Sequence, residues 1–384
     1  MIWLLAAIAF AIWRYVRSPL EHAFTTEIPN DLEVYLLGGQ RVAEHQPLYA
    51  GDLMPGLPFT YPPFAGVLFS WLGEATTAKG IAWNVFSVVV LGAVIRMASR
   101  SSSPWLRTLI LTAFFVICTE PVHSTLYFGQ VNILLMALVC LDFLPRHRLP
   151  GIGTGLAAGF KLTPAFFIVL LALQKRWGAM FVAAFTFLCT VATGYANVPD
   201  AHDFWTRAIF DTSRVGVDDN PGALALRQVL HRLGADSTPL WLLLALLVTL
   251  LCAFASRRAP APLALAFFGM TACLVSPFSW MHHWVWIVPF GVWIYERLGP
   301  IAFIALMSPY AAVNVLGPLG GTTRDLLFVG VPIIFMLVYP FARPGSNMRG
   351  GLLLSKKGTH REDPPHRRSR RGGNRHRPRT RRLG

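Results

Sequence analysis

The sequence predicts an all-α, polytopic integral membrane protein, and three observations lead to this prediction. Of its 384 residues, 54% are hydrophobic and only 14% are charged, and the mean hydropathy is +0.49. Such a chain has too little polar surface to cover a soluble globule of its size. Apolar runs of about transmembrane length recur from one end to the other. All five cysteines fall within these runs or directly after one, so nothing suggests a disulfide or metal framework.

The apolar runs predict about ten to twelve transmembrane helices in one domain, residues 1–342, because a span needs roughly 20 residues and several runs are short or interrupted. The first run, Ile2 to Val16, has no basic start and no small-residue cleavage site. We therefore expect a retained helix rather than a cleaved leader. The longer runs cover residues 83–95, 105–117, 131–144, 152–173, 177–195, 240–255, 262–275, 284–294, 301–316 and 326–341.

Two long polar loops interrupt the pattern, at residues 17–58 and 197–239. The first is acidic and contains NDLEVY, which is typical of a helix start with Asn30 or Asp31 as the N-cap. A catalytic role for Asp31 is the alternative interpretation. The second loop alternates aspartates with arginines.

Two apolar runs contain breaks that predict irregular backbone within the membrane. Residues 59–72 are interrupted by Pro62-Pro63, and residues 152–173 are interrupted at the Lys161-Leu162-Thr163-Pro164 stretch. We expect both segments to dip into the bilayer rather than cross it as straight helices. Irregular backbone at membrane depth is tolerated only where it is buried in protein or lines a cavity, so the breaks point to a site.

The C-terminal residues 343–384 carry fourteen Lys or Arg against two acidic residues, and they hold most of the net charge of +15. Few apolar residues are present, so we expect a disordered tail. Because basic segments stay inside, we expect this tail to be cytoplasmic and to lie on anionic lipid headgroups rather than to bind nucleic acid. Counting back from the tail, the 197–239 loop and the SWMHH stretch, Ser279 to His283, fall on the outer face.

Ionisable groups inside apolar segments are costly and usually face a cavity or a partner. Lys161 lies deep within its run, where it is either a snorkelling lysine or a counter-charge for a phosphate. His282 and His283 lie among tryptophans, either as an interface belt or as ligand contacts. Adjacent helical residues point about 100° apart, so we expect at most one histidine to reach a common ligand well, and no two-histidine metal site.

Five motifs occur in an order that resembles glycosyltransferase family 87, the actinobacterial polyprenyl-phosphate-mannose-dependent mannosyltransferases. The resemblance covers roughly residues 31–341 and omits the tail. Each motif alone is weak, but the five in this order are specific. They are NDLEVYLLGGQRVAEHQPLYAGD, LPFTYPPFAGVLF, FGQVNILLMALVCLD, GLAAGFKLTPAFF and VSPFSWMHHWVWIVP.

The resemblance implies the many-helix C-type glycosyltransferase fold, whose first outer loop carries the catalytic acid. It implies inverting, single-displacement α-(1→2) mannosyl transfer at the outer face of the plasma membrane, from polyprenyl-phosphate-mannose to a lipid-linked mannan such as a phosphatidylinositol mannoside, lipomannan or lipoarabinomannan. The family's proposed general base matches Asp31, with Glu33 and Asp52 as competitors in the same loop.

The remaining candidate contacts divide between donor and acceptor. We expect Lys161, assisted by His282 or His283, to hold the donor phosphate or reacting sugar. Tyr61, Gln130 and Asn132 are candidate sugar or acceptor contacts, although a Tyr-Pro-Pro turn and a helix-capping GQVN are equally good structural interpretations. Because the leaving group is a single phosphate, we expect no obligatory metal and no cofactor.

One departure from the family pattern concerns the acceptor. The late outer loop of relatives usually contains an Asn-Gln-Ser stretch, whereas this chain has DDNPGALALR at residues 218–227. Arg227, which ends this stretch, is a candidate acceptor contact. The departure bears on acceptor specificity more than on the chemistry.

Two other functions fit part of the pattern. A transporter or lipid flippase also uses broken helices and intramembrane Lys or His, but it predicts an inverted repeat, which the sequence does not show. A membrane acyltransferase with a histidine base does not require the acidic loop around Asp31.

Overall fold

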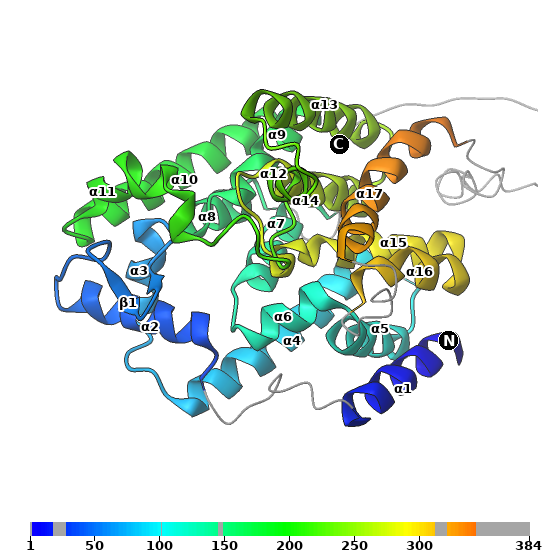
Figure 1. Ribbon diagram of the computed structural model, residues 1–384, viewed down its shortest axis with the longest axis horizontal. Coiled ribbons are helices and arrows are strands. Elements are labelled where there is room, and N and C mark those ends of the chain that lie inside the picture. The colour runs from blue at the N-terminus through cyan, green and yellow to red at the C-terminus, as the bar shows by residue number, and fades with distance from the viewer. Residues whose placement is uncertain (1, 18–27, 101, 145–148, 312–320, 343–384) are drawn as a thin grey trace, which may run out of the picture. The chain divides into compact units, whose positions relative to one another are not determined.

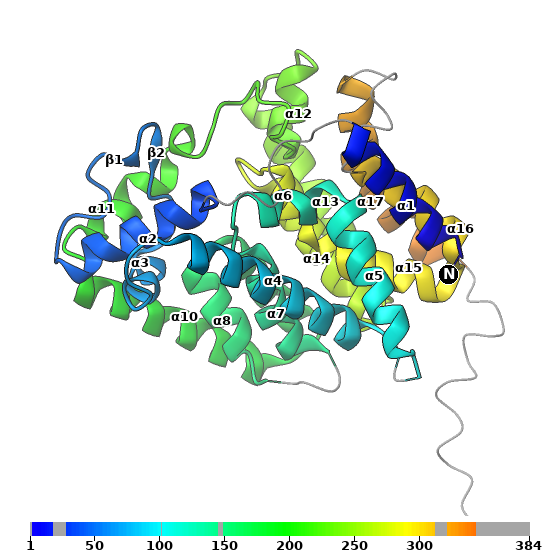
Figure 2. The same ribbon diagram turned by 90° about the horizontal axis from the view of Figure 1, so that it is seen from below.

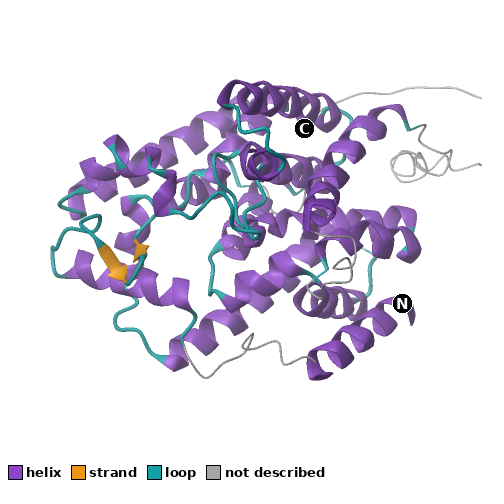
Figure 3. Ribbon diagram, viewed as in Figure 1, coloured by secondary structure: helices purple, strands orange, loops and turns teal. Residues whose placement is uncertain are grey.

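The computed structural model describes residues 2–17, 28–100, 102–144, 149–311 and 321–342, and it is almost entirely helical (Figure 3). The described part confirms the all-α class, with one short antiparallel strand pair as its sheet. The predicted basic tail, residues 343–384, lies outside the described residues.

The N-terminal half of the described chain contains α1 (Ile2–Arg17), α2 (Asn30–Ala43), β1 (Asp52–Met54), β2 (Leu57–Pro58), α3 (Pro63–Ser70), α4 (Thr77–Ala98), α5 (Trp105–Cys118), α6 (Glu120–Tyr127), α7 (Asn132–Phe143), α8 (Ile152–Phe160), the 3-10 turn η1 (Thr163–Ala165) and α9 (Phe166–Leu173) (Figure 1). The C-terminal half contains α10 (Trp177–Asn197), α11 (Ala201–Thr206), η2 (Ala208–Phe210), η3 (Thr212–Arg214), α12 (Leu226–Arg232), α13 (Thr238–Ser256), α14 (Ala261–Val275), η4 (Met281–Trp286), α15 (Ile287–Leu298), α16 (Pro300–Met307), η5 (Ser308–Tyr310), α17 (Gly321–Val338) and η7 (Tyr339–Phe341).

Four described helices are long and apolar enough to cross a membrane, namely α4, α10, α13 and the α17–η7 helix. The bent pair α6 and α7 counts as a fifth if it forms one broken span, and four further apolar helices are shorter. These helices confirm a polytopic membrane protein. The count of ten to twelve spans stays a prediction.

The core of the described domain runs along α14. Every residue of this helix from Leu263 to Leu274 is buried, which is the pattern of a helix surrounded by other helices. It packs against α13, α15 and η4. Trp286 presses against Gly269, where a Cβ would overlap the indole ring, so the close contact between α14 and η4 requires glycine there.

The first polar loop folds onto α3 and onto the second polar loop (Figures 1 and 2). The predicted helix at NDLEVY is present as α2, which packs on α3. The Asp200 carboxylate, just before α11, accepts hydrogen bonds from the backbone N–H groups of Leu48 and Tyr49, both at 2.7 Å. The two loops are therefore fastened together on one side of the domain.

Both predicted breaks are present. α3 has only eight residues, starts at Pro63 and is too short to span a bilayer. The 152–173 segment forms α8, then Lys161 in extended conformation at φ −149°, then η1 and α9. α8 lies so close against α10 that a Cβ at Gly155 would come within 2.5 Å of the Ala183 carbonyl oxygen, so this contact requires glycine. This packing fixes the position of the break at Lys161.

Candidate functional site

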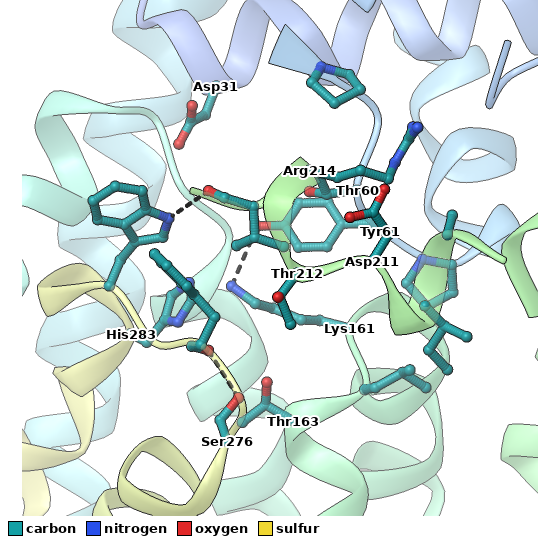
Figure 4. Close-up of a pocket in the computed structure, with 18 of the residues that line it drawn as sticks. Asp31, Thr60, Tyr61, Lys161, Thr163, Asp211, Thr212, Arg214, Ser276 and His283 are labelled. Carbon is teal, nitrogen blue, oxygen red and sulfur yellow. Dashed lines mark hydrogen bonds between the residues drawn. The ribbon is translucent and has the colours of Figure 1, made fainter. Parts of the chain in front are cut away.

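One cavity of about 250 Å³ lies where the loops and the helix breaks meet (Figure 4). Its walls come from the start of α2, the turn after β2, the turn between α6 and α7, the break at Lys161, the η2–η3 stretch of the second loop, and the segment between α14 and η4. Asp31 and Lys161 both line it. These two candidate groups, which are far apart in the sequence, thus share one cavity.

Asp31 lies in the first turn of α2, and neither Asn30 nor Asp31 is the N-cap that the sequence predicted. The helix begins at Asn30 with Pro29 as its cap residue, and the backbone N–H of Asp31 donates to the Phe128 carbonyl at 3.1 Å. The Asp31 carboxylate accepts a hydrogen bond from the Gln130 side-chain amide. Burial raises the pKa of Asp31, and the Gln130 hydrogen bond and the charge of Lys161 oppose that rise.

Lys161 is buried at the break between α8 and η1. Its ammonium donates to the Tyr61 hydroxyl at 3.2 Å and to the Asn132 side-chain oxygen at 3.0 Å, and it lies 5.0 Å from the centre of the Tyr61 ring. A lysine ammonium has three donors, so one remains for a ligand. A side chain fixed inside the protein in this way does not snorkel to the membrane interface.

His282 and His283 both line the cavity, and the expectation that at most one of them reaches a common ligand well stays a prediction. They lie on a kinked 3-10 segment rather than an α-helix, and their rings are in contact at 4.8 Å between centroids. Neither ring nitrogen of His282 has a partner within the described residues. His283 Nδ1 lies 3.3 Å from the Ser279 hydroxyl.

Tyr61, Gln130 and Asn132 connect these groups. The Tyr61 hydroxyl donates to Gln130 Oε1 at 2.9 Å, and the Asn132 amide donates to the His282 carbonyl at 2.9 Å. Asn132 is not the cap of α7 but its first residue, after Val131. A continuous set of hydrogen bonds therefore runs from Asp31 through Gln130, Tyr61, Lys161 and Asn132 to the backbone of His282.

Three sequence candidates lie away from this cavity. Glu33 and Asp52 are absent from its lining, and the Asp52 carboxylate accepts from the Gly56 N–H at 2.9 Å within the β1–β2 turn. Arg227 lies 3.8 Å from Asp218 and lines a separate small hollow with Asp236. Its position gives no support to an acceptor contact.

The divergent 218–227 stretch holds the histidine segment in place. Met281 N–H donates to the Gly222 carbonyl at 2.8 Å, and Leu224 N–H donates to the Ser279 carbonyl at 2.6 Å. The Gln228 amide, just beyond the stretch, donates to the Pro277 carbonyl at 3.0 Å. The stretch that departs from the family pattern thus supports the histidine segment through backbone hydrogen bonds.

Sequence reasoning missed Arg214 and Asp211, which line the cavity from η3 and its N-cap (Figure 4). No carboxylate forms an ion pair with Arg214 in the described part of the chain, and its guanidinium donates to the Phe59 carbonyl at 3.4 Å. Nothing in the local sequence separates Arg214 from the other arginines of this loop. It reaches the site through the tertiary contacts of the second loop, with the first loop at Asp200 and with the Trp280 indole at Val215.

Two other acids in the apolar part of the chain, the buried Asp142 and the half-buried Glu120, are structural. The Asp142 carboxylate accepts from the Gly151 and Thr154 backbone N–H groups at 3.1 and 2.6 Å, so it caps the start of α8. Glu120 accepts from the Ser124 hydroxyl at 2.5 Å within α6. Neither lines the cavity.

Comparison with known proteins places this cavity in a family. The model of glycosyltransferase family 87 matches residues 59–277. A polyprenol-phosphate-mannose-dependent alpha-(1-2)-phosphatidylinositol mannoside mannosyltransferase of Mycolicibacterium smegmatis is 32% identical over 333 residues, which is 75% of each chain. The corresponding enzyme of Mycobacterium tuberculosis is 33% identical over 75% of this chain and 74% of its own.

A second kind of relative is equally similar. A polyprenol-phosphate-mannose-dependent alpha-(1-2)-phosphatidylinositol pentamannoside mannosyltransferase of Mycolicibacterium smegmatis is 32% identical over 83% of this chain and 80% of its own. No solved structure matches the chain. The family match spans more than half of the chain, and the curated relatives cover at least three quarters of it. This membrane protein therefore belongs to glycosyltransferase family 87.

Proposed function

We propose that the protein transfers a mannosyl group from a polyprenyl-phosphate-mannose donor to a mannosylated phosphatidylinositol-type lipid and forms an α-(1→2) linkage. The relatives named for this reaction support the donor, the sugar and the linkage. The observation that carries the proposal is the shared cavity of Asp31 and Lys161, because the reaction needs a base and a fixed cation in one place. The transporter or flippase alternative gains no support from these relatives.

The reaction is a single in-line displacement. Asp31 accepts the proton of the acceptor hydroxyl while the hydroxyl oxygen bonds to the anomeric carbon. The bond between that carbon and the phosphate oxygen breaks, and its electron pair leaves with the polyprenyl phosphate. The configuration inverts, so a β-linked donor gives an α-linked product. The family match begins after Asp31, so its role rests on the cavity geometry and on the DLEVY motif.

Two cations serve the leaving phosphate in this proposal. Lys161 has one free donor and lies in a poorly solvated place, where a fixed charge acts far more strongly than in water. Arg214, on the opposite loop, offers a guanidinium with no carboxylate partner among the described residues. The unpartnered His282 ring is a hydrogen-bond donor or acceptor for the donor phosphate or the sugar. No metal enters this scheme.

The proposal sets the cavity at the outer face of the plasma membrane, where a lipid-linked donor meets a lipid-linked acceptor. Residues 17–58 and 197–239 are then outer loops, and the basic tail is cytoplasmic against anionic headgroups. The donor's polyprenyl chain belongs in the bilayer beside the cavity.

The reaction is tested with purified protein, radiolabelled polyprenyl-phosphate-mannose and a panel of phosphatidylinositol mannosides of increasing length. We expect label in a lipid product with the wild type, and a kcat about 10²–10⁴-fold lower with Asp31→Asn, because the amide is no longer a base. Glu33→Gln is the matched control from the same helix, and we expect it to retain activity.

Either of two results would contradict the proposal. Unchanged label transfer by Asp31→Asn removes Asp31 as the base. Absence of transfer to every acceptor, combined with movement of labelled donor across sealed vesicles, favours the transporter.

A further inference from the structure

The hydrogen bonds around Asp31 all point one way. Lys161 donates to the Tyr61 hydroxyl, that hydroxyl donates to Gln130 Oε1, and the Gln130 amide nitrogen donates to Asp31 Oδ2. Every proton in this series faces the carboxylate. Donors aimed at a carboxylate stabilise its ionised form and disfavour the protonated acid.

Tyr61 decides which end of the Gln130 amide faces Asp31. If the amide were turned over, its carbonyl oxygen would meet the carboxylate and its NH₂ would meet the Tyr61 hydroxyl. The Tyr61 hydroxyl prevents this because it already accepts a hydrogen bond from Lys161 and donates its own hydrogen bond to Gln130 Oε1. Asn132 also directs its amide at the same oxygen, at 3.5 Å.

The second carboxylate oxygen of Asp31 stays free. Within the described residues, the Gln130 amide is the one side-chain donor on the Asp31 carboxylate, and it occupies Oδ2. Oδ1 therefore remains available on the cavity wall. A general base needs this arrangement, in which one oxygen is anchored and the other can receive a proton.

We infer that Gln130 is a positioning residue that anchors the Asp31 carboxylate in its ionised form, and that Tyr61 acts through Gln130 by fixing the direction of its amide. The inference rests on the proposed function only for the use of Asp31 as a base. It replaces the expectation that Tyr61 and Gln130 are sugar or acceptor contacts. Both side chains are buried, as a supporting role requires.

The direction of the pH effect follows from the groups around Asp31. Without the Gln130 donor, burial is less strongly opposed and the pKa of Asp31 rises further. Lys161 still favours the ionised form. As the solution is acidified, Asp31 is then protonated at a higher pH and can no longer act as a base. The acidic limb of the pH–activity profile therefore shifts to higher pH. The other titratable groups lining the cavity are Tyr35, Tyr61, Asp211, Arg214, His282 and His283.

The test measures the ionisation of Asp31 without using the reaction. A water-soluble carbodiimide modifies protonated carboxyl groups, and mass spectrometry quantifies the modification of Asp31 against pH in the purified full-length protein. Exposed Asp52, outside the cavity, is the reference within the same sample. We expect the midpoint for Asp31 to rise by roughly one to two pH units in Gln130→Ala, the size expected for one lost hydrogen bond to a buried charge.

Two further variants separate positioning from general damage. Tyr61→Phe leaves Gln130 in place but frees its amide, so we expect a smaller upward shift. Tyr35→Phe removes the same kind of hydroxyl one step outside the series, where its partner is Tyr61 at 2.8 Å, and we expect no shift. If Gln130→Ala does not fold, Tyr61→Phe still decides the matter.

A midpoint unchanged in Gln130→Ala, or in Tyr61→Phe where the first variant does not fold, overturns the inference. Equal shifts in Tyr35→Phe and Tyr61→Phe also overturn it. Because labelling needs no substrate, these results stand even when no mannosyl transfer is found, which would count against the proposed function alone. In the transfer assay, we expect Gln130→Ala to lower kcat with little change in KM and to regain activity at higher pH, whereas loss of a sugar contact raises KM at every pH.

Discussion

Two neighbouring segments of similar length show how this protein makes a site inside a membrane. α10 is a continuous helix of 21 residues that buries only Ala183, Thr190 and Gly194 and exposes large apolar side chains such as Phe185. The adjacent 152–173 segment is also apolar, yet it breaks at Lys161. In lipid, backbone polar groups must be paired within the helix, so a break survives only where protein covers it.

The same contrast recurs around the whole cavity. Gln130 lies at the turn where α6 and α7 bend by 119°, and His282 and His283 lie on the irregular segment between α14 and α15. Asp31 lies in the first turn of α2. Each of these groups comes from a place where a regular helix starts, ends or breaks, so the chemistry is concentrated where the apolar pattern fails.

The strongest test of this contrast replaces two lysines separately, one inside the break and one just beyond the end of the same segment. Lys161→Met removes the fixed cation from the cavity, and we expect kcat to fall about 10²–10³-fold. Lys175→Met, an exposed position between α9 and α10, removes the same charge outside the site. We expect it to leave kcat unchanged.

Steady-state kinetics on both purified variants measures the difference, with thermal unfolding in detergent to confirm that each is folded. Equal losses in the two variants, or a fully active Lys161→Met, would show that the break supplies no catalytic charge.

Hydropathy predicts the regular parts of this molecule well, because lipid-facing helices must be apolar along their whole length. The breaks at Pro62-Pro63 and Lys161 are also visible in the sequence, since proline ends helices and a lysine in an apolar run is costly. Both features are present in the structure. The resemblance to the family supplied the role of Asp31.

The contacts between loops could not be predicted in this way. Arg214 reaches the cavity through contacts that are remote in sequence: Asp200 binds the backbone at Leu48 and Tyr49, about 150 positions away, and the Trp280 indole donates to the Val215 carbonyl at 3.1 Å. Arg227 is an equally plausible arginine in the same loop, yet it lies in another hollow. Likewise, the joint exposure of His282 and His283 to the cavity depends on a 3-10 kink that the sequence does not signal.

A weaker effect is expected at Arg214, which approaches the cavity from a loop rather than from a broken helix. We expect Arg214→Ala to lower kcat/KM about tenfold, mainly through a higher KM for the donor, because one charge-assisted contact to a phosphate is lost. Arg207→Ala is the control, since Arg207 is exposed and pairs with Asp203 at 2.8 Å within its own stretch of the loop. We expect it to behave like the wild type.

Donor titrations at fixed acceptor concentration measure the effect. The slope of activity against ionic strength gives a second readout, because an accessible charge is screened by salt more than a buried one. A KM unchanged in Arg214→Ala would leave Lys161 as the sole proposed cation for the donor phosphate.

The smallest effect is expected on the outer face of α10. The Phe185 side chain is 68% exposed and lies in the membrane-length part of the helix, where exchange of one apolar side chain for another leaves its surroundings apolar. We therefore expect Phe185→Leu to change the free energy of unfolding by less than about 0.5 kcal/mol and to leave transfer unaffected. Thermal unfolding and a donor titration on the same preparation measure both quantities. A raised KM for the long-chain donor but a normal KM for a short-chain analogue would contradict this expectation. Such a result would mean that the outer face of α10 binds the donor's hydrocarbon chain. The unbroken helix would then take part in donor recognition as well as the broken one.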